Sequence, residues 1–239
     1  MTTGELANET AARRGLGDAA WADAVWRRAQ QVAFAVIAYM AGLSALYFIF
    51  IAFPDVLETH DVTPVFPAAK ANWALLVAHC VFALPPLLLG LVGFIEGVRR
   101  KRPKLHRDAG LLYCVCIWLS APAGALLATA NRSGPLAGAG FFVLGVFWFA
   151  TTWRAYSTAR AKNFVDHRRW MIRSYALTLA FVTVRPLFVF GPMGGFSSAD
   201  WQIVVAWACW VPNLALAELY LWATRPNGAL RSFPQRAAA

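Results

Sequence analysis

The sequence predicts an all-α protein, a polytopic transmembrane bundle of six helices. Of its 239 residues, 59% are hydrophobic and only 14% are charged, and the mean hydropathy is +0.50, far from the composition of a soluble domain. The apolar residues gather in runs of about 20, the length that crosses a bilayer. The basic residues alternate from one connection to the next, as the connections of a multi-pass protein do.

The apolar runs are bounded by proline, glycine, asparagine or charge clusters. In order, they cover residues 33–53, 73–98, 109–130, 138–156, 171–190 and 201–224. We therefore expect a transmembrane domain over 31–224 and a tail over 225–239. Prolines inside four runs predict kinks, because each removes one helical hydrogen bond: Pro85, Pro86, Pro122, Pro186 and Pro212. Small residues such as Gly140 and Gly145 favour close helix packing.

Charge gives the orientation of the bundle. Arg27 and Arg28 precede the first run, RRKRPKLHR follows the second, and four cations follow the fourth, whereas the other connections are acidic or nearly uncharged. By the positive-inside rule, both termini are cytoplasmic. The net charge of +10 does not indicate nucleic-acid binding, because the basic residues form no single stripe with stacking aromatics.

The first 30 residues form a cytoplasmic segment before the first run. Trp21, Val25 and Trp26 share one helical side, so the segment could lie along the headgroups as an interfacial helix before the chain turns inward. A frayed tail is the alternative. The segment is too long and too mixed in charge to be a signal n-region, so the first run stays as an anchor.

Two similar pieces, KLHRDAGLLY and VDHRRWMIRSY, open the third and fifth runs with His-Arg. Because these helices run in the same direction, His106 and His167 should lie at similar depth near the cytoplasmic interface. Two imidazoles on parallel helices can hold one metal or clamp one haem iron from both faces.

Other residues border this predicted site. Gly110 and Tyr113 lie on the face of His106, and a glycine one turn from a ligand leaves room for a flat macrocycle. Arg173 belongs to the second piece, and we include it among the cofactor-binding candidates. The alternative is that the histidines and arginines here are ordinary positive-inside residues that meet phosphate headgroups and bind no ligand.

A second polar site is expected deeper in the bundle. His79 lies inside the second run, where a polar side chain needs a partner, and Arg185 in the fifth run is the candidate. Arg185 follows His167 by 18 residues, about 27 Å of helix and a whole number of turns, which predicts a polar line down one face. Its guanidinium would suit a haem propionate, a quinone carbonyl or a lipid phosphate, or it could simply snorkel.

Two acidic residues remain. Glu96 and Glu218 lie near the cytoplasmic ends of their runs, at the depth of Arg154 and Arg173. Interhelical ion pairs are the plain interpretation, with a proton relay as the alternative.

The pieces KLHRDAGLLY and NFVDHRRWMIRSYALTLAFVTVRP resemble the bacterial membrane family called domain of unknown function 2306 (DUF2306) over the second to fifth runs. This resemblance implies a multi-pass protein of the bacterial cytoplasmic (inner) membrane and no particular activity. The histidine placement is also similar to cytochrome b561 bundles, where His106 and His167 would match one haem and His79 half of another. The fourth run has no histidine, so the second haem could not be built.

The functional hypothesis is a membrane redox protein that binds one b-type haem or a quinone and exchanges electrons with a redox partner. A small-anion or proton-coupled transporter is the alternative. A third possibility is a structural accessory subunit of a membrane complex.

Overall fold

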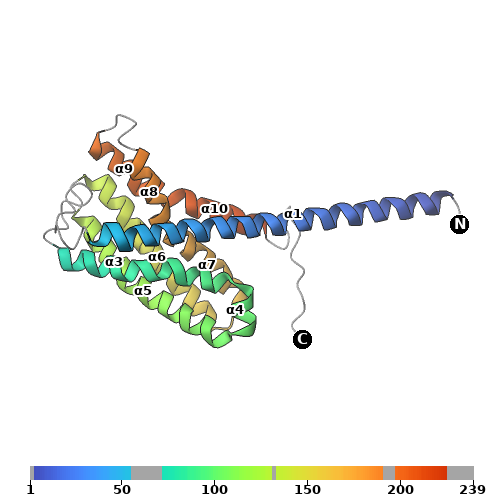
Figure 1. Cartoon of the computed structure of the whole chain (residues 1–239), viewed down its shortest axis with the longest axis horizontal. Helices are drawn as coiled ribbons and strands as arrows, with labels where there is room; N and C mark the ends of the chain where they lie inside the picture. The colour runs from blue at the N-terminus through green and yellow to red at the C-terminus, as the bar shows by residue number, and fades with distance from the viewer. Residues whose placement is uncertain (1–2, 55–71, 131–132, 191–196, 225–239) are drawn as a thin grey trace.

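The computed structural model describes residues 3–54, 72–130, 133–190 and 197–224, and within them every regular element is a helix (Figure 1). The predicted all-α class is therefore confirmed for this part of the chain. The helices are α1 (Thr3–Tyr47), the π-helix η1 (Phe48–Ala52), α3 (Trp73–Phe94), α4 (Glu96–Lys101), α5 (Pro103–Thr129), α6 (Pro135–Arg160), α7 (Phe164–Thr178), α8 (Ala180–Phe190), α9 (Ser198–Ala208) and α10 (Val211–Ala223).

Among the described residues, five helical segments are long and apolar enough to cross a membrane. They are Ala24–Ala52, Trp73–Phe94, Pro103–Thr129, Pro135–Arg160 and Asp200–Ala223. The chain is thus a multi-pass membrane protein by its helices, and the predicted count of six is not confirmed. The predicted fifth run, 171–190, is divided at Leu179 into α7 and α8, which are each too short to cross alone.

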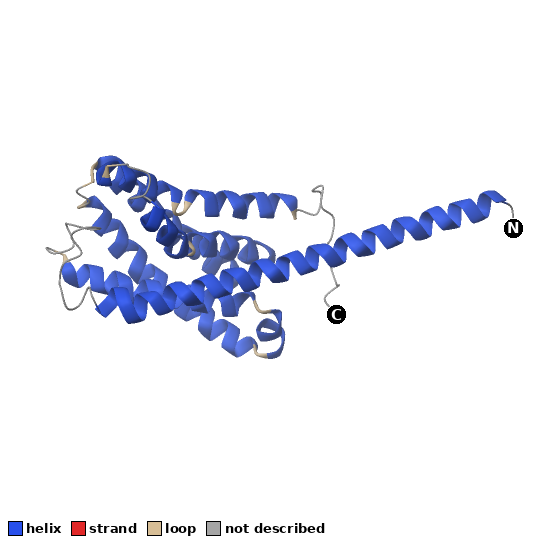
Figure 2. Ribbon diagram, turned by 45° about the horizontal axis from the view of Figure 1, so that its top comes forward, coloured by secondary structure: helices blue, strands red, loops and turns tan. Residues whose placement is uncertain are grey.

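Helix α1 is continuous from Thr3 to Tyr47, and its N-terminal part projects beyond the bundle as a straight rod (Figures 1 and 2). The chain therefore makes no turn between the N-terminal segment and the first span, and an interfacial helix that turns into the bilayer is not what the structure shows. The alanine-rich sequence of this segment favours helix. The span itself packs against α3 and α8 through small buried residues, Ala41 and Ala45.

The core of the bundle is a row of packed helices in which α3 lies on α5, α5 on α6 and α6 on α7. Small residues let these helices approach closely. A Cβ on Gly145 would lie 3.0 Å from the carbonyl oxygen of Ala121, and a Cβ on Gly140 would lie 2.9 Å from Ala206. The predicted role of these glycines in packing is confirmed.

Two helix breaks lie near each other in the bundle and are linked through Thr183 and Asn213. One lies at Leu179, and the other at Cys209–Trp210 divides α9 from α10. The Asn213 amide donates to the Cys209 carbonyl (3.1 Å) and to Thr183 Oγ1 (2.9 Å), and Thr183 Oγ1 lies 3.0 Å from the Leu179 carbonyl. Side chains thus bond the backbone carbonyls at both breaks, as apolar surroundings require.

The breaks do not follow the prolines in a simple way. Pro212 opens α10 and coincides with a break, but Pro186 lies inside α8, well beyond the break at Leu179. The run predicted over 73–98 also ends early, because Ile95 is extended and separates α3 from the short helix α4.

Candidate functional site

The histidines predicted to pair, His106 and His167, do lie near each other. His106 is in the first turn of α5 and His167 in the first turn of α7, and His106 lies within electrostatic range of His167 and Arg99. The start of α7 is fixed by a capping pair, in which the Asn163 side chain accepts from the Asp166 N–H (3.2 Å). We call this end of the molecule, where α4 and the first turns of α5 and α7 lie, the basic end.

The two imidazoles differ in their hydrogen bonds. His167 Nδ1 lies 2.8 Å from the carbonyl oxygen of Ala155, so this nitrogen carries the proton and donates. Its Nε2 then keeps a lone pair and a fixed direction, as metal-ligating histidines do. His106 Nδ1 is buried and has no hydrogen-bond partner among the described residues. Burying a polar atom without a hydrogen-bond partner costs free energy, so His106 Nδ1 and His167 Nε2 are the two nitrogens of the pair that could bind a ligand.

Below the histidine pair lies a fully buried set of hydrogen-bonded side chains, which we call the hydroxyl network. Tyr113 from α5 lies 2.8 Å from Ser174 Oγ and 3.0 Å from Thr178 Oγ1, both on α7. Thr152 Oγ1 of α6 lies 2.7 Å from Ser174 Oγ, and the Trp148 indole donates to Thr178 Oγ1 at 2.9 Å. The network joins the three helices and leaves the Tyr113 hydroxyl engaged by protein.

The hydroxyl network and the histidine pair share the same helix faces. Tyr113 follows His106 by seven residues, and Ser174 follows His167 by seven residues, which is two turns in each case. Only Tyr113 was predicted. The sequence signal for the others was the spacing of Ser174 and Thr178, one turn apart on the His167 face of an apolar run.

Gly110 lies between His106 and Tyr113 on this face of α5. A Cβ built on Gly110 would have nothing within 4 Å, so the position is open. A Cβ on Gly90 of α3 would instead lie 2.3 Å from the Tyr175 ring. Gly110 therefore leaves space beside the predicted ligand His106, whereas Gly90 allows tight packing.

Arg173 is held by an acidic partner on α10. Its Nε lies 2.5 Å and its Nη2 2.9 Å from the two carboxylate oxygens of Glu218, and its guanidinium lies 4.7 Å from the Trp170 ring centroid. The predicted interhelical ion pair of Glu218 is confirmed, and it occupies the guanidinium edge that a cofactor would need. The prediction for Glu96 is wrong, because Glu96 pairs with Arg100 (3.3 Å) on its own short helix α4.

The predicted pairing of His79 with Arg185 is also wrong. His79 Nδ1 lies 2.9 Å from the Ser120 carbonyl oxygen, and Ser120 Oγ lies 3.0 Å from both Nδ1 and the carbonyl of His79. The ring rests on Gly124, where a Cβ would lie only 2.7 Å away. His79 therefore faces α5, while the next residue, Cys80, faces Arg185, because successive helical side chains diverge by about 100°.

Arg185 lies instead among aromatic rings. Its Cζ is 4.6 Å from the Phe181 ring centroid and 5.3 Å from that of Tyr47, the residue that precedes the π-helix η1. Its Nε is buried without a hydrogen-bond partner among the described residues. The predicted polar line from His167 to Arg185 is wrong, because the break at Leu179 interrupts the helical register between them.

The sequence model of a family described as a predicted membrane protein of unknown function, DUF2306, matches residues 76–221. The chain belongs to this family. The match begins within α3 and ends within α10, so it covers the histidine pair, the hydroxyl network and Arg185 of this DUF2306 protein but not α1. No curated protein and no solved structure matches the chain.

Proposed function

We propose that this DUF2306 protein is a membrane redox protein that holds one b-type haem between His106 and His167. The observation that carries the proposal is the His167 imidazole, whose Nδ1 donates to the Ala155 carbonyl (2.8 Å) and whose Nε2 is thereby left to act as a ligand close to His106. Histidine is a common axial ligand of haem iron.

The residues around the pair fit a flat macrocycle. Gly110 leaves open space on the His106 face, and the Nδ1 of His106 is a buried atom that lacks a hydrogen-bond partner among the residues that the structure describes. Haem bound in this way supplies reversible one-electron transfer. The chain itself fixes the ligand direction at Ala155 and holds α5, α6 and α7 together through the hydroxyl network.

The test is a reduced-minus-oxidised visible spectrum of the detergent-purified full chain, expressed with ample haem. We expect a sharp b-type band that disappears in His106→Ala and His167→Ala. His79→Gln is the matched control, because His79 Nδ1 bonds Ser120 on α5, away from the histidine pair, and its replacement should not affect the band. A flat wild-type spectrum, or an unchanged band in either alanine variant, would contradict the proposal. A flat spectrum with co-purifying quinone that is lost in His167→Ala would replace haem by quinone as the occupant.

The proposed topology has both termini in the cytoplasm of a bacterium, with the chain in its inner membrane. The basic end carries Arg99, Arg168 and Arg169, which supports a cytoplasmic position for it. Together α7 and α8 would cross as one broken helix and give six spans. Reporter fusions after residues 132, 195 and 239 test this, since only the last should report the cytoplasm.

A transporter of small anions or protons is the second candidate. It is favoured by the two facing breaks, joined through Thr183 and Asn213, because interrupted helices form substrate sites in many transporters. The Nε of Arg185, which is buried and has no hydrogen-bond partner within the described part of the chain, would be the anion contact. Chloride flux into proteoliposomes should then be lost in Arg185→Gln and kept in Arg154→Gln. Equal flux in both variants would exclude this role for Arg185.

A further inference from the structure

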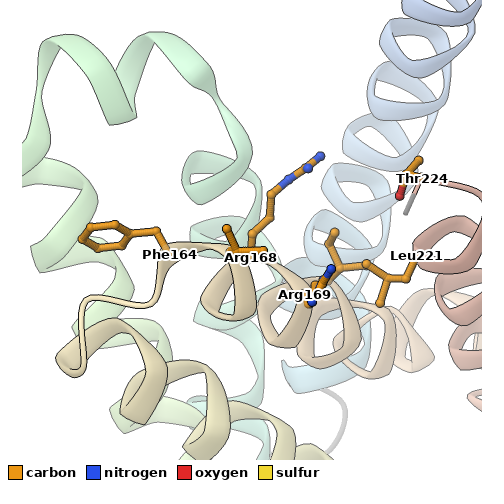
Figure 3. A pocket seen from close by; sticks show the side chains of 7 residues that line it. Phe164, Arg168, Arg169, Leu221 and Thr224 are labelled. Carbon is orange, nitrogen blue, oxygen red and sulfur yellow. The ribbon is translucent and has the colours of Figure 1, made fainter. Parts of the chain in front are cut away.

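A cavity of about 300 Å³ opens at the basic end, between the first turns of α7 and the last turns of α10 (Figure 3). The side chains that matter are two cations, Arg168 and Arg169, and an apolar wall made of Val165, Ile172 and Leu221. Figure 3 shows Arg168 and Arg169 on α7 and Leu221 and Thr224 on α10 across the opening. The lining includes no carboxylate among the described residues.

The two arginines are held in place by neighbours. Arg168 Nη2 donates to the Tyr220 hydroxyl (3.2 Å), and this hydroxyl also accepts from Gln30 of α1 (3.3 Å). Arg169 Nη1 lies 3.0 Å from Asp166 Oδ1, in a pair whose side chains are 43% and 41% exposed. Two guanidinium groups thus give the described lining of the cavity a basic wall. Its arginine forks are pre-organised, which lowers the entropy lost when they bind an anion.

The cavity also lies at one end of an apolar helical segment, where a lipid headgroup is expected. Its α10 side is the end of the apolar segment Asp200–Ala223, and Trp222 beside it is 56% exposed, as tryptophans at membrane interfaces are. On α7, Phe164 and Val165 are 67% and 65% exposed, which places apolar surface next to the arginines. Arginine forks suit phosphate oxygens, and basic pockets between transmembrane helices bind anionic headgroups.

We propose that this cavity is a binding site for an anionic phospholipid. The phosphate is held by Arg168 and Arg169, and an acyl chain lies along Val165, Ile172 and Leu221. The apolar wall favours a lipid over free phosphate, because only a lipid has an acyl chain that can bury apolar surface against the wall. The bound lipid joins α7 to α10 and, through Tyr220, to α1. The site does not depend on the histidine pair.

Native mass spectrometry of the full chain in detergent tests the site, with titrations of phosphatidylglycerol, phosphatidylcholine and inorganic phosphate. We expect phosphatidylglycerol to bind with a stoichiometry of one at concentrations where phosphatidylcholine does not. The double variant Arg168→Gln/Arg169→Gln should weaken this binding about thirty-fold, at roughly five-fold for each cation near the membrane surface. Leu221→Trp, which fills the cavity without changing charge, should weaken it as well.

The matched control is Arg107→Gln/Arg160→Gln, which removes the same charge from exposed positions of α5 and α6 at the same end. This control should bind phosphatidylglycerol like the wild type. Equal weakening in the control and the double variant would overturn the proposal in favour of diffuse attraction to the basic end. Inorganic phosphate binding that Leu221→Trp leaves unchanged would overturn the lipid and leave a small-anion site. If the double variant is not monodisperse, Leu221→Trp alone tests the proposal, and unchanged phosphatidylglycerol binding in Leu221→Trp would overturn it.

Discussion

Two regions of this DUF2306 protein place histidine among packed helices, and they differ in how completely the neighbouring helices bond the imidazoles. At His79, one serine provides both a carbonyl and a hydroxyl within 3.0 Å, and Gly124 makes room for the ring. At the basic end, His167 Nδ1 is anchored on a carbonyl, whereas His106 Nδ1 is buried and has no hydrogen-bond partner in the described ranges. A polar residue in a membrane span therefore indicates a binding site only when its own helices leave it unsatisfied.

The largest expected effect concerns stability and separates the two regions. His79→Ala removes a buried ring and its bonds to Ser120, which should lower the free energy of unfolding by about 2–4 kcal/mol. His167→Ala, near a helix start and only half-buried, should cost about 1 kcal/mol or less. Unfolding in mixed detergent, followed by circular dichroism, measures both. Equal losses of stability in the two variants would contradict the difference between the two regions.

The glycines beside the two regions provide a second test of the difference between them. Gly124→Ala places a Cβ 2.7 Å from the His79 ring and should destabilise by about 1–3 kcal/mol. Gly110→Leu enters open space and should leave thermal stability unchanged while lowering the amount of bound haem. The haem content and melting temperature of the two variants test this. A stability loss in Gly110→Leu that matches the loss in Gly124→Ala would contradict the open space.

Tyr113 tests where the histidine site ends. Tyr113→Phe removes the hydroxyl that bonds Ser174 and Thr178, and the expected loss is about 0.5–2 kcal/mol of stability. The position of the haem band should not move, because the hydroxyl is engaged by protein rather than by the cofactor. A shifted band with unchanged stability would make Tyr113 a cofactor contact.

The smallest effect belongs to the ion pair of Arg173 with Glu218. Glu218→Gln should cost less than about 1 kcal/mol, because the Glu218 side chain is 47% exposed and solvent screens the pair. Thermal melts at low and high salt measure this, and the difference between wild type and variant should shrink at high salt. A loss of haem in Glu218→Gln would return Arg173 to the cofactor site.

The sequence was sufficient for the features that follow from helix length, helix direction and residue spacing. Hydropathy runs predicted the all-α class, and the matching direction of two helices placed His106 beside His167. The spacing of seven residues put Tyr113 on the correct face of α5.

The features that depend on the detailed packing of one helix on another were not predictable in this way. Ser120 lies 41 positions from His79, and its role depends on how α3 packs on α5. The break at Leu179 has no proline or glycine beside it that would have predicted it. Its hydrogen bonds come instead from Thr183 and Asn213, which lie on two different helices. One break was enough to make the expected line from His167 to Arg185 wrong.

The most direct test of the histidine pair is the haem content of the purified full chain, together with the electron paramagnetic resonance spectrum of its oxidised form. We expect one low-spin b-type haem per chain, as two histidine ligands would give, and its loss in both His106→Ala and His167→Ala. A haem-free wild-type chain after expression with ample haem, or one low-spin haem retained in either alanine variant, would contradict it.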